Sequence, residues 1–185
     1  MININDIKNG MTIKIENNIY QIIEFQHVKP GKGPAFVRIK LKNLRTGANI
    51  EQTFNSNIKF EKAAIEKTEM QFLYKTGTTY NFMNMNSYEQ VELSKEQIGD
   101  DTIYLKDGLD VSLSFYDGEL LGIIFPDKIA VKIVSAEPAV KGNTTSNASK
   151  EAIVETGLMV KVPMFINAGE VIIISTKDGK YDSRA

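Results

Sequence analysis

The chain of 185 residues contains no cysteine and a single histidine, His27. Without cysteine there is no disulfide framework, no thiol nucleophile and no thiolate metal site. One histidine forms neither a His-containing dyad of the usual kind nor a multi-histidine metal site, and its place at a strand end predicts a hydrogen-bonded structural residue. The phosphate loop of nucleotide hydrolases is absent too, because neither serine nor threonine follows Gly31-Lys32. We therefore expect no enzyme, no catalytic residue, no metal and no cofactor.

Long hydrophobic runs are also missing. No apolar stretch approaches the roughly 20 residues that span a bilayer, and Met1–Asp6 lacks the charged start and hydrophobic core of a signal peptide. These features predict a cytoplasmic protein with no membrane partner.

Basic and acidic residues are unevenly distributed along the chain. Residues 1–64 contain 10 basic and 5 acidic residues, residues 65–127 contain 4 and 12, and residues 128–185 contain 8 and 6. The formal net charge of −1 hides this asymmetry. A basic first third and an acidic middle predict that only part of the surface meets nucleic acid.

A turn built from glycine and proline lies in the basic third. Lys32 stands between Gly31 and Gly33, which are flanked in turn by Pro30 and Pro34, with Lys29 just before. Proline fixes φ and glycine permits positive φ, so the segment predicts a tight turn that projects the Lys32 side chain outward. A slim ammonium on such a tip can enter a space too narrow for a domain.

Basic residues continue after this turn. Between Phe25 and Ile50 the sequence has six lysines and arginines and no acidic residue, which predicts unopposed positive charge. The segment 37–42 alternates strictly, so as a strand it places Val37, Ile39 and Leu41 on a core face. The opposite face is a basic stripe, which we define as Arg38, Lys40 and Lys42. Phosphate backbones are common partners of such a stripe, and a merely solvated face is the alternative.

Short strand patterns separated by turn signals recur through the chain, which predicts an all-β protein of small barrels. Ser94–Asp101 is the one helix expected, with Ser94 as its N-cap and Gln97 three residues on. The expected strands are 19–25, 36–44, 49–54, 70–75, 80–85, 90–93, 110–116, 120–125, 129–137, 152–162 and 170–175.

These residues resemble the bacterial elongation factor P family from end to end. The first third matches at 27–33, 35–38 and 44–47. The last third matches at Lys150, Ala152, Gly157, Val160, Val162, Pro163, Ile166, Gly169, Gly179, Tyr181, Ser183 and Arg184. The resemblance implies three small barrels in an L shape. Residues 1–64 would form an SH3-like, KOW-type domain with the lysine-tipped loop, 65–127 a central OB-type barrel and 128–185 a C-terminal OB-type barrel.

The resemblance also implies a function and its residues. Such factors bind the ribosome between the peptidyl and exit sites and stimulate peptide-bond formation at consecutive prolines. Lys32 would reach the CCA end of the peptidyl-tRNA, either bare or extended by a lysine-modifying enzyme, and the factor would act as a monomer. The residues that would contact RNA are Lys29, Arg38, Lys40, Lys42, Arg45, Gly142, Asn143, Thr144, Tyr181 and Arg184.

One departure from the family and one alternative function accompany this expectation. The segment 142–144, which would meet the exit-site codon of the mRNA, has Asn143 where the family often has aspartate. The alternative function is a general RNA-binding protein or RNA chaperone built from small barrels, which explains the stripe but gives no reason for a lone lysine tip.

Overall fold

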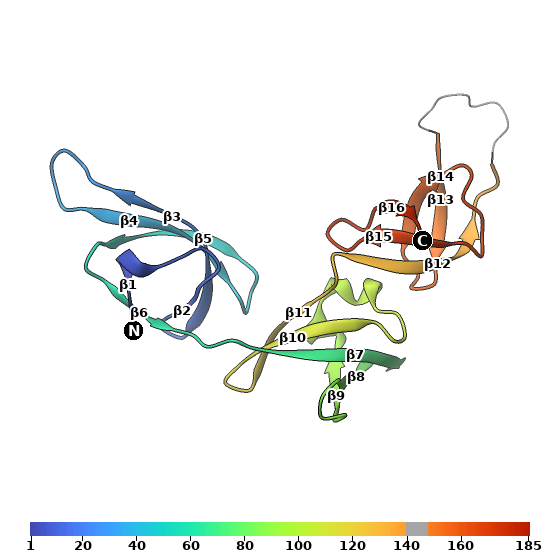
Figure 1. Ribbon diagram of the computed structural model, residues 1–185, viewed down its shortest axis with the longest axis horizontal. Coiled ribbons are helices and arrows are strands. Elements are labelled where there is room, and N and C mark those ends of the chain that lie inside the picture. The colour runs from blue at the N-terminus through green and yellow to red at the C-terminus, as the bar shows by residue number, and fades with distance from the viewer. Residues whose placement is uncertain (140–147) are drawn as a thin grey trace. The chain divides into compact units, whose positions relative to one another are not determined.

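A computed structural model describes residues 1–139 and 148–185 of the chain. In these residues the strands form three sheets, and helices are short (Figure 1). The all-β expectation is therefore confirmed. The described residues form two compact units, Met1–Lys67 with Ser114–Gly122, and Thr68–Leu113 with Ile123–Ala185.

The first sheet has six strands in the order β1-β6-β2-β3-β4-β5. They are β1 (Ile2–Asn3), β2 (Thr12–Ile15), β3 (Asn18–Val28), β4 (Phe36–Asn43), β5 (Asn49–Asn55) and β6 (Lys59–Lys62), with a 3-10 turn, η1 (Ile4–Asp6), after β1. The side chains of Val37, Ile39 and Leu41 are fully buried, as the alternation of β4 predicts. They join a core that includes Ile4, Ile13 and Ile22. Strands β1, β2 and β6 were not predicted, since short edge segments carry little periodicity.

The second sheet has five strands in the order β11-β10-β7-β8-β9. They are β7 (Glu66–Thr76), β8 (Thr79–Asn84), β9 (Gln90–Ser94), β10 (Asp110–Tyr116) and β11 (Glu119–Ile124). The helix α1 (Lys95–Ile98) ends earlier than expected, and a 3-10 turn, η2 (Asp100–Tyr104), follows it. The predicted cap at Ser94 is confirmed, because its hydroxyl accepts from the Gln97 backbone N–H and its own N–H donates to the Gln97 side chain.

The third sheet also has five strands, in the order β14-β13-β12-β15-β16. They are β12 (Lys128–Ala136), β13 (Ser149–Val154), β14 (Met159–Pro163), β15 (Val171–Ser175) and β16 (Tyr181–Arg184). The single strand expected over 152–162 is wrong. Gly157 adopts a φ of 89°, and its turn folds β14 back against β13, with Ala152 opposite Val160.

Candidate nucleic-acid interface

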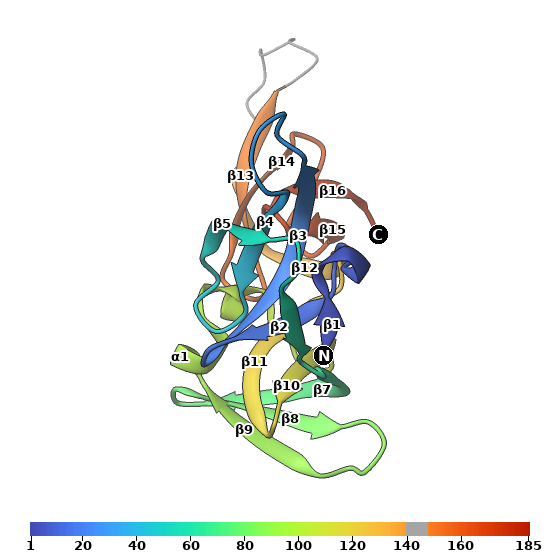
Figure 2. The same ribbon diagram turned by 90° about the vertical axis from the view of Figure 1, so that its left-hand side faces the viewer.

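Strands β3 and β4 form a long hairpin that carries the predicted lysine tip. Val28 lies opposite Phe36, so residues 29–35 close the hairpin. Figures 1 and 2 show this closed end extending away from the chain's N-terminus. The long two-stranded ribbon projects its closed end beyond the rest of the first sheet (Figure 1).

The tip is exposed and depends on one glycine. Gly33 has a φ of 109°, a conformation that residues with a side chain rarely adopt. Lys32 lies beside it at the middle of the loop and is exposed, as are Gly31 and Pro34. Among the described residues no ion pair involves Lys32. The tip therefore offers its ammonium to solvent, as the sequence predicts.

The basic stripe on β4 is exposed but not unopposed. Arg38, Lys40 and Lys42 alternate with buried residues along the strand. Lys40 Nζ lies 2.9 Å from Glu24 Oε2 and Arg38 Nε lies 3.6 Å from Glu51 Oε1. The expectation of unopposed charge is wrong for these two residues, and Lys42 is the stripe residue with no ion pair among the residues described.

The pairing of strands brings the two carboxylates to the stripe. Glu24 lies opposite Lys40 across β3 and β4, next to a bulge at Ile23, and Glu51 lies opposite Lys40 on β5. The hydrogen bond from Lys40 to Glu24, followed by the carboxylate's charge, raises the pKa of Lys40 above its ordinary value. Both glutamates stand just outside the acid-free segment between Phe25 and Ile50, which is why counting charges along the chain missed them.

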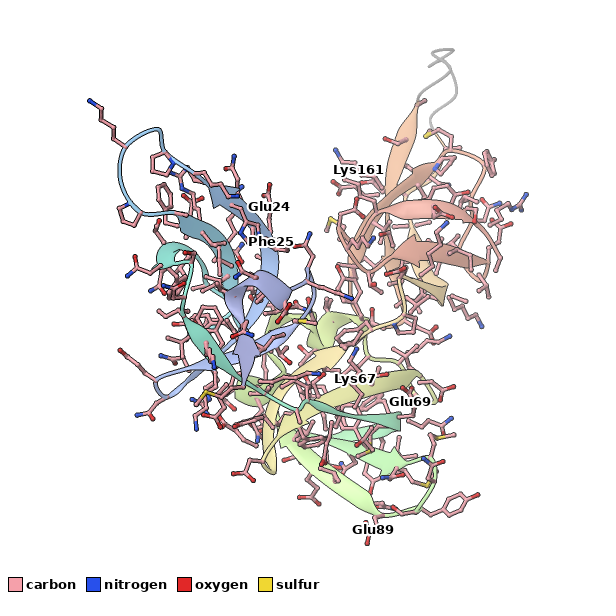
Figure 3. All side chains as sticks on the ribbon, turned by 60° about the vertical axis from the view of Figure 1, so that its left-hand side comes forward. Glu24, Phe25, Lys67, Glu69, Glu89 and Lys161 are labelled. Carbon is pink, nitrogen blue, oxygen red and sulfur yellow. The ribbon has the colours of Figure 1, made fainter. Side chains whose placement is uncertain are left out.

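A shallow hollow lies between these charges. Its volume is about 150 Å³, and it is lined by Glu24, Phe25, Gln26, Arg38, Lys40 and Glu51. Figure 3 shows Glu24 and Phe25 on the hairpin, below its closed end. The hollow therefore contains both signs of charge on an exposed face.

His27 packs against the ring of Phe25. It is exposed, and its ring lies edge-on to Phe25 at a centroid distance of 5.6 Å. No side-chain hydrogen bond joins it to another described residue. The expectation of a hydrogen-bonded structural histidine is therefore wrong, and the contact that the His27 ring makes is with Phe25 in the same strand.

Arg45 lies in the predicted turn after β4, where other protein groups hold it. The Asn43 side-chain oxygen accepts from the backbone N–H groups of Arg45 and Thr46. The Arg45 guanidinium donates to both carboxylate oxygens of Glu119, at 3.1 and 2.9 Å, and to the backbone carbonyl of Asn17. Sequence reasoning did not identify this carboxylate, which is 74 residues away along the chain.

The remaining predicted RNA contacts belong to the last third of the chain. Gly142, Asn143 and Thr144 lie outside the described residues. Tyr181 and Arg184 are both on β16. Arg184 pairs with the Glu170 carboxylate, and its guanidinium lies over the Phe165 ring at 5.4 Å.

Glu170 is held in its ionised form by these neighbours. The backbone N–H of Asn167 donates to its carboxylate, and Arg184 donates to the other oxygen. Both hydrogen bonds lower the pKa of Glu170 below its ordinary value, with the Asn167 bond the larger cause. Arg184 is thus partly engaged within its own barrel.

Residues 1–139 and 148–185 contain no cluster of three histidine, cysteine, aspartate or glutamate side chains that could hold a metal ion. Over the same residues, no helix has the length and apolar character needed to cross a membrane.

Two solved structures have a fold similar to that of this chain. The chain is similar to "Eukaryotic translation initiation factor 5A from Methanococcus jannaschii", with a TM-score of 0.53 and 24% identity over 64% of this chain and 88% of that one. It is also similar to "Translation initiation factor eif-5a family protein from Naegleria fowleri ATCC 30863", with a TM-score of 0.51 and 17% identity over 64% and 91%. At these identities the likeness shows the fold alone.

Sequence comparison then gives the family. The model of the elongation factor P KOW-like domain matches residues 3–60, that of its OB domain matches 65–123, and that of its C-terminal domain matches 129–184. Elongation factor P of Phytoplasma australiense is 57% identical over 185 residues, which is all of this chain and 98% of the relative. That of Onion yellows phytoplasma (strain OY-M) is 56% identical over the same shares. The chain belongs to the elongation factor P family, and it is a translation factor built from KOW-like and OB domains.

Proposed function

We propose that this factor binds the ribosome between the peptidyl and exit sites and stimulates peptide-bond formation at consecutive prolines. The observation that carries the proposal is the exposed Lys32 at the closed end of the β3–β4 hairpin. Membership of the elongation factor P family supports it. The tip would lie beside the CCA end of the peptidyl-tRNA.

The contribution to the reaction is one of position. Proline's ring restricts its backbone, so a reactive geometry with the peptidyl-tRNA is reached infrequently. Holding two reactants in a reactive arrangement removes part of the entropic barrier that they otherwise cross on encounter. Lys32 would hold the end of the peptidyl-tRNA while the ribosome forms the bond. The tip residues Lys29, Pro30, Gly31, Gly33 and Pro34 would set its reach, and a lysine-modifying enzyme could extend it.

Affinity for the ribosome would come from other surfaces. Arg38, Lys40 and Lys42 would meet RNA phosphates, and releasing condensed counterions makes such contacts favourable. All three are exposed, but Arg38 and Lys40 have to exchange a carboxylate for a phosphate, whereas Lys42 has no ion pair among the described residues. Tyr181, Arg184 and residues 142–144 would lie near the exit-site codon. In this proposal domains 1–64, 65–127 and 128–185 act together in one monomer.

The test is synthesis of a triple-proline reporter in a purified translation system, with and without the factor. A reporter with three alanines in place of the prolines is the matched control. We expect the factor to raise the yield of the proline reporter and leave the alanine reporter unchanged. Equal synthesis of the proline reporter with and without the factor would contradict the proposal. An equal rise in both reporters would instead favour the general RNA chaperone.

A further inference from the structure

The Arg45 guanidinium joins three turns that are distant in the sequence. Arg45 itself lies between β4 and β5, Asn17 lies between β2 and β3, and Glu119 begins β11. The guanidinium contacts Glu119 through two parallel hydrogen bonds and Asn17 through its backbone carbonyl. A planar guanidinium matches a carboxylate in this two-bond arrangement, which fixes direction as well as distance.

The contact ties a hairpin of the second sheet to the first barrel. Strands β10 and β11 belong to the second sheet, yet their closed end, Ser114–Gly122, forms one compact unit with Met1–Lys67. The hairpin's turn is well defined, since Asp117 and Gly118 have φ values of 49° and 79°. Such a turn places Glu119 at a fixed point of the strand that follows.

The Arg45 side chain is also anchored from its own side. The Asn43 side chain, whose residue is only 8% exposed, accepts a hydrogen bond from the backbone N–H of Arg45. This hydrogen bond fixes the turn from which the Arg45 side chain extends. Three of the guanidinium's nitrogens already donate to protein acceptors. Few donors remain for a phosphate, because the guanidinium has five N–H groups in all.

We propose that Arg45 is a positioning residue that clamps the β10–β11 hairpin to the first barrel through Glu119, and that it does not bind RNA. The first barrel, which carries Lys32, is held to this hairpin by a contact within the protein. This inference rests on the proposed function for its activity readout, but the clamp itself can be tested without the ribosome.

The first test follows the hairpin in the isolated full-length protein. Amide hydrogen exchange over residues 114–122 is compared for the wild type, Arg45→Ala, Glu119→Ala and the charge swap Arg45→Glu with Glu119→Arg. Removal of either partner should speed exchange of these amides, and the swap should slow it again. Unchanged exchange in both single variants would overturn the clamp, whatever the factor does on the ribosome.

The second test separates positioning from RNA contact. We measure the ribosome Kd, its dependence on salt, and the Pro-Pro transfer rate at saturating factor. Both single variants should lower the saturating rate by about two- to fivefold, the factor that an exposed ion pair supports. The salt slope should stay unchanged, and the swap should recover most of the rate, which simple loss of stability does not explain.

An RNA contact at Arg45 gives the opposite pattern. Arg45→Ala would then flatten the salt slope by about 0.7 to 0.9, as expected for Lys42→Ala, which serves as the matched control. Glu119→Ala would leave the rate unchanged or tighten binding, and the swap would not restore function. That pattern would overturn the inference. A wild type that fails to stimulate the proline reporter would refute the proposed function alone, because hydrogen exchange still decides the clamp.

Discussion

Removing the two carboxylates beside the basic stripe should strengthen binding to the ribosome. The double variant Glu24→Gln, Glu51→Gln frees Lys40 and Arg38, which are 2.9 and 3.6 Å from these carboxylates. Both glutamates are about half exposed, with side-chain exposures of 62% and 48%, so glutamine is tolerated there. The change leaves every basic residue in place and removes only the two carboxylates that compete with phosphate for Arg38 and Lys40.

The size of the effect follows from the local charge. In the wild type the stripe's three cations stand beside two carboxylates, and in the variant they stand alone. Each additional phosphate contact steepens the dependence of log affinity on log salt by about 0.7 to 0.9, so two contacts add up to about 1.4 to 1.8. Between 50 and 200 mM salt, each contact corresponds to about a threefold difference in affinity.

The assay is ribosome binding over a series of salt concentrations. Glu61→Gln is the matched control, because it removes a carboxylate from β6, three strands from β4 in the sheet. Replacing Arg38, Lys40 and Lys42 together with alanine should flatten the slope. If the double glutamine variant has the wild-type slope and affinity, Arg38 and Lys40 do not contact phosphate and the stripe is a solvated face.

Two further predictions concern stability. Gly179→Ala should destabilise the unit that contains it by more than about 1 kcal/mol in urea unfolding, because φ is 70° and the new Cβ would lie 3.0 Å from Tyr104 Oη. Gly77→Ala has a similar φ of 61° with nothing near its Cβ, so an equal loss there would show that Tyr104 contributes nothing. Glu170 has a lowered pKa, so its stabilising effect is complete above about pH 4.5 and is lost as pH falls through its folded pKa. Glu170→Gln should therefore flatten the loss of stability below pH 4.5, and a wild-type acid profile in this variant would show that the hydrogen bonds from Asn167 and Arg184 do not stabilise the fold.

Features set by local chemistry could be predicted from the sequence. Period-two alternation predicted which residues of β4 are buried, because a strand's side chains alternate between faces. The cap at Ser94 and the exposed tip at Lys32 depend on residues within a few positions of each other. At the tip, proline fixes φ and glycine permits positive φ, so the local pattern is sufficient there.

Features set by pairing across the structure were missed. The turn at 44–47 sets the register of β4 and β5, so pairing residues outward from it could have placed Glu51 opposite Lys40. In that position Glu51 is also within reach of Arg38. The pair of Lys40 with Glu24 depends on a bulge at Ile23, which the sequence pattern does not predict. The Arg45 contact with Glu119 joins residues 74 apart, and only the folded chain brings them together.

The most direct test of the central claim is single-turnover Pro-Pro bond formation with the wild type, Lys32→Ala and Lys32→Arg. Arginine keeps the positive charge but replaces a slim ammonium with a broad planar group, whereas alanine removes both charge and length. If Lys32 positions the peptidyl-tRNA from within a narrow space, both variants should bind ribosomes nearly as well as the wild type and neither should accelerate the reaction. An arginine variant with most of the wild-type rate would contradict this, and would show that the tip is one more phosphate contact.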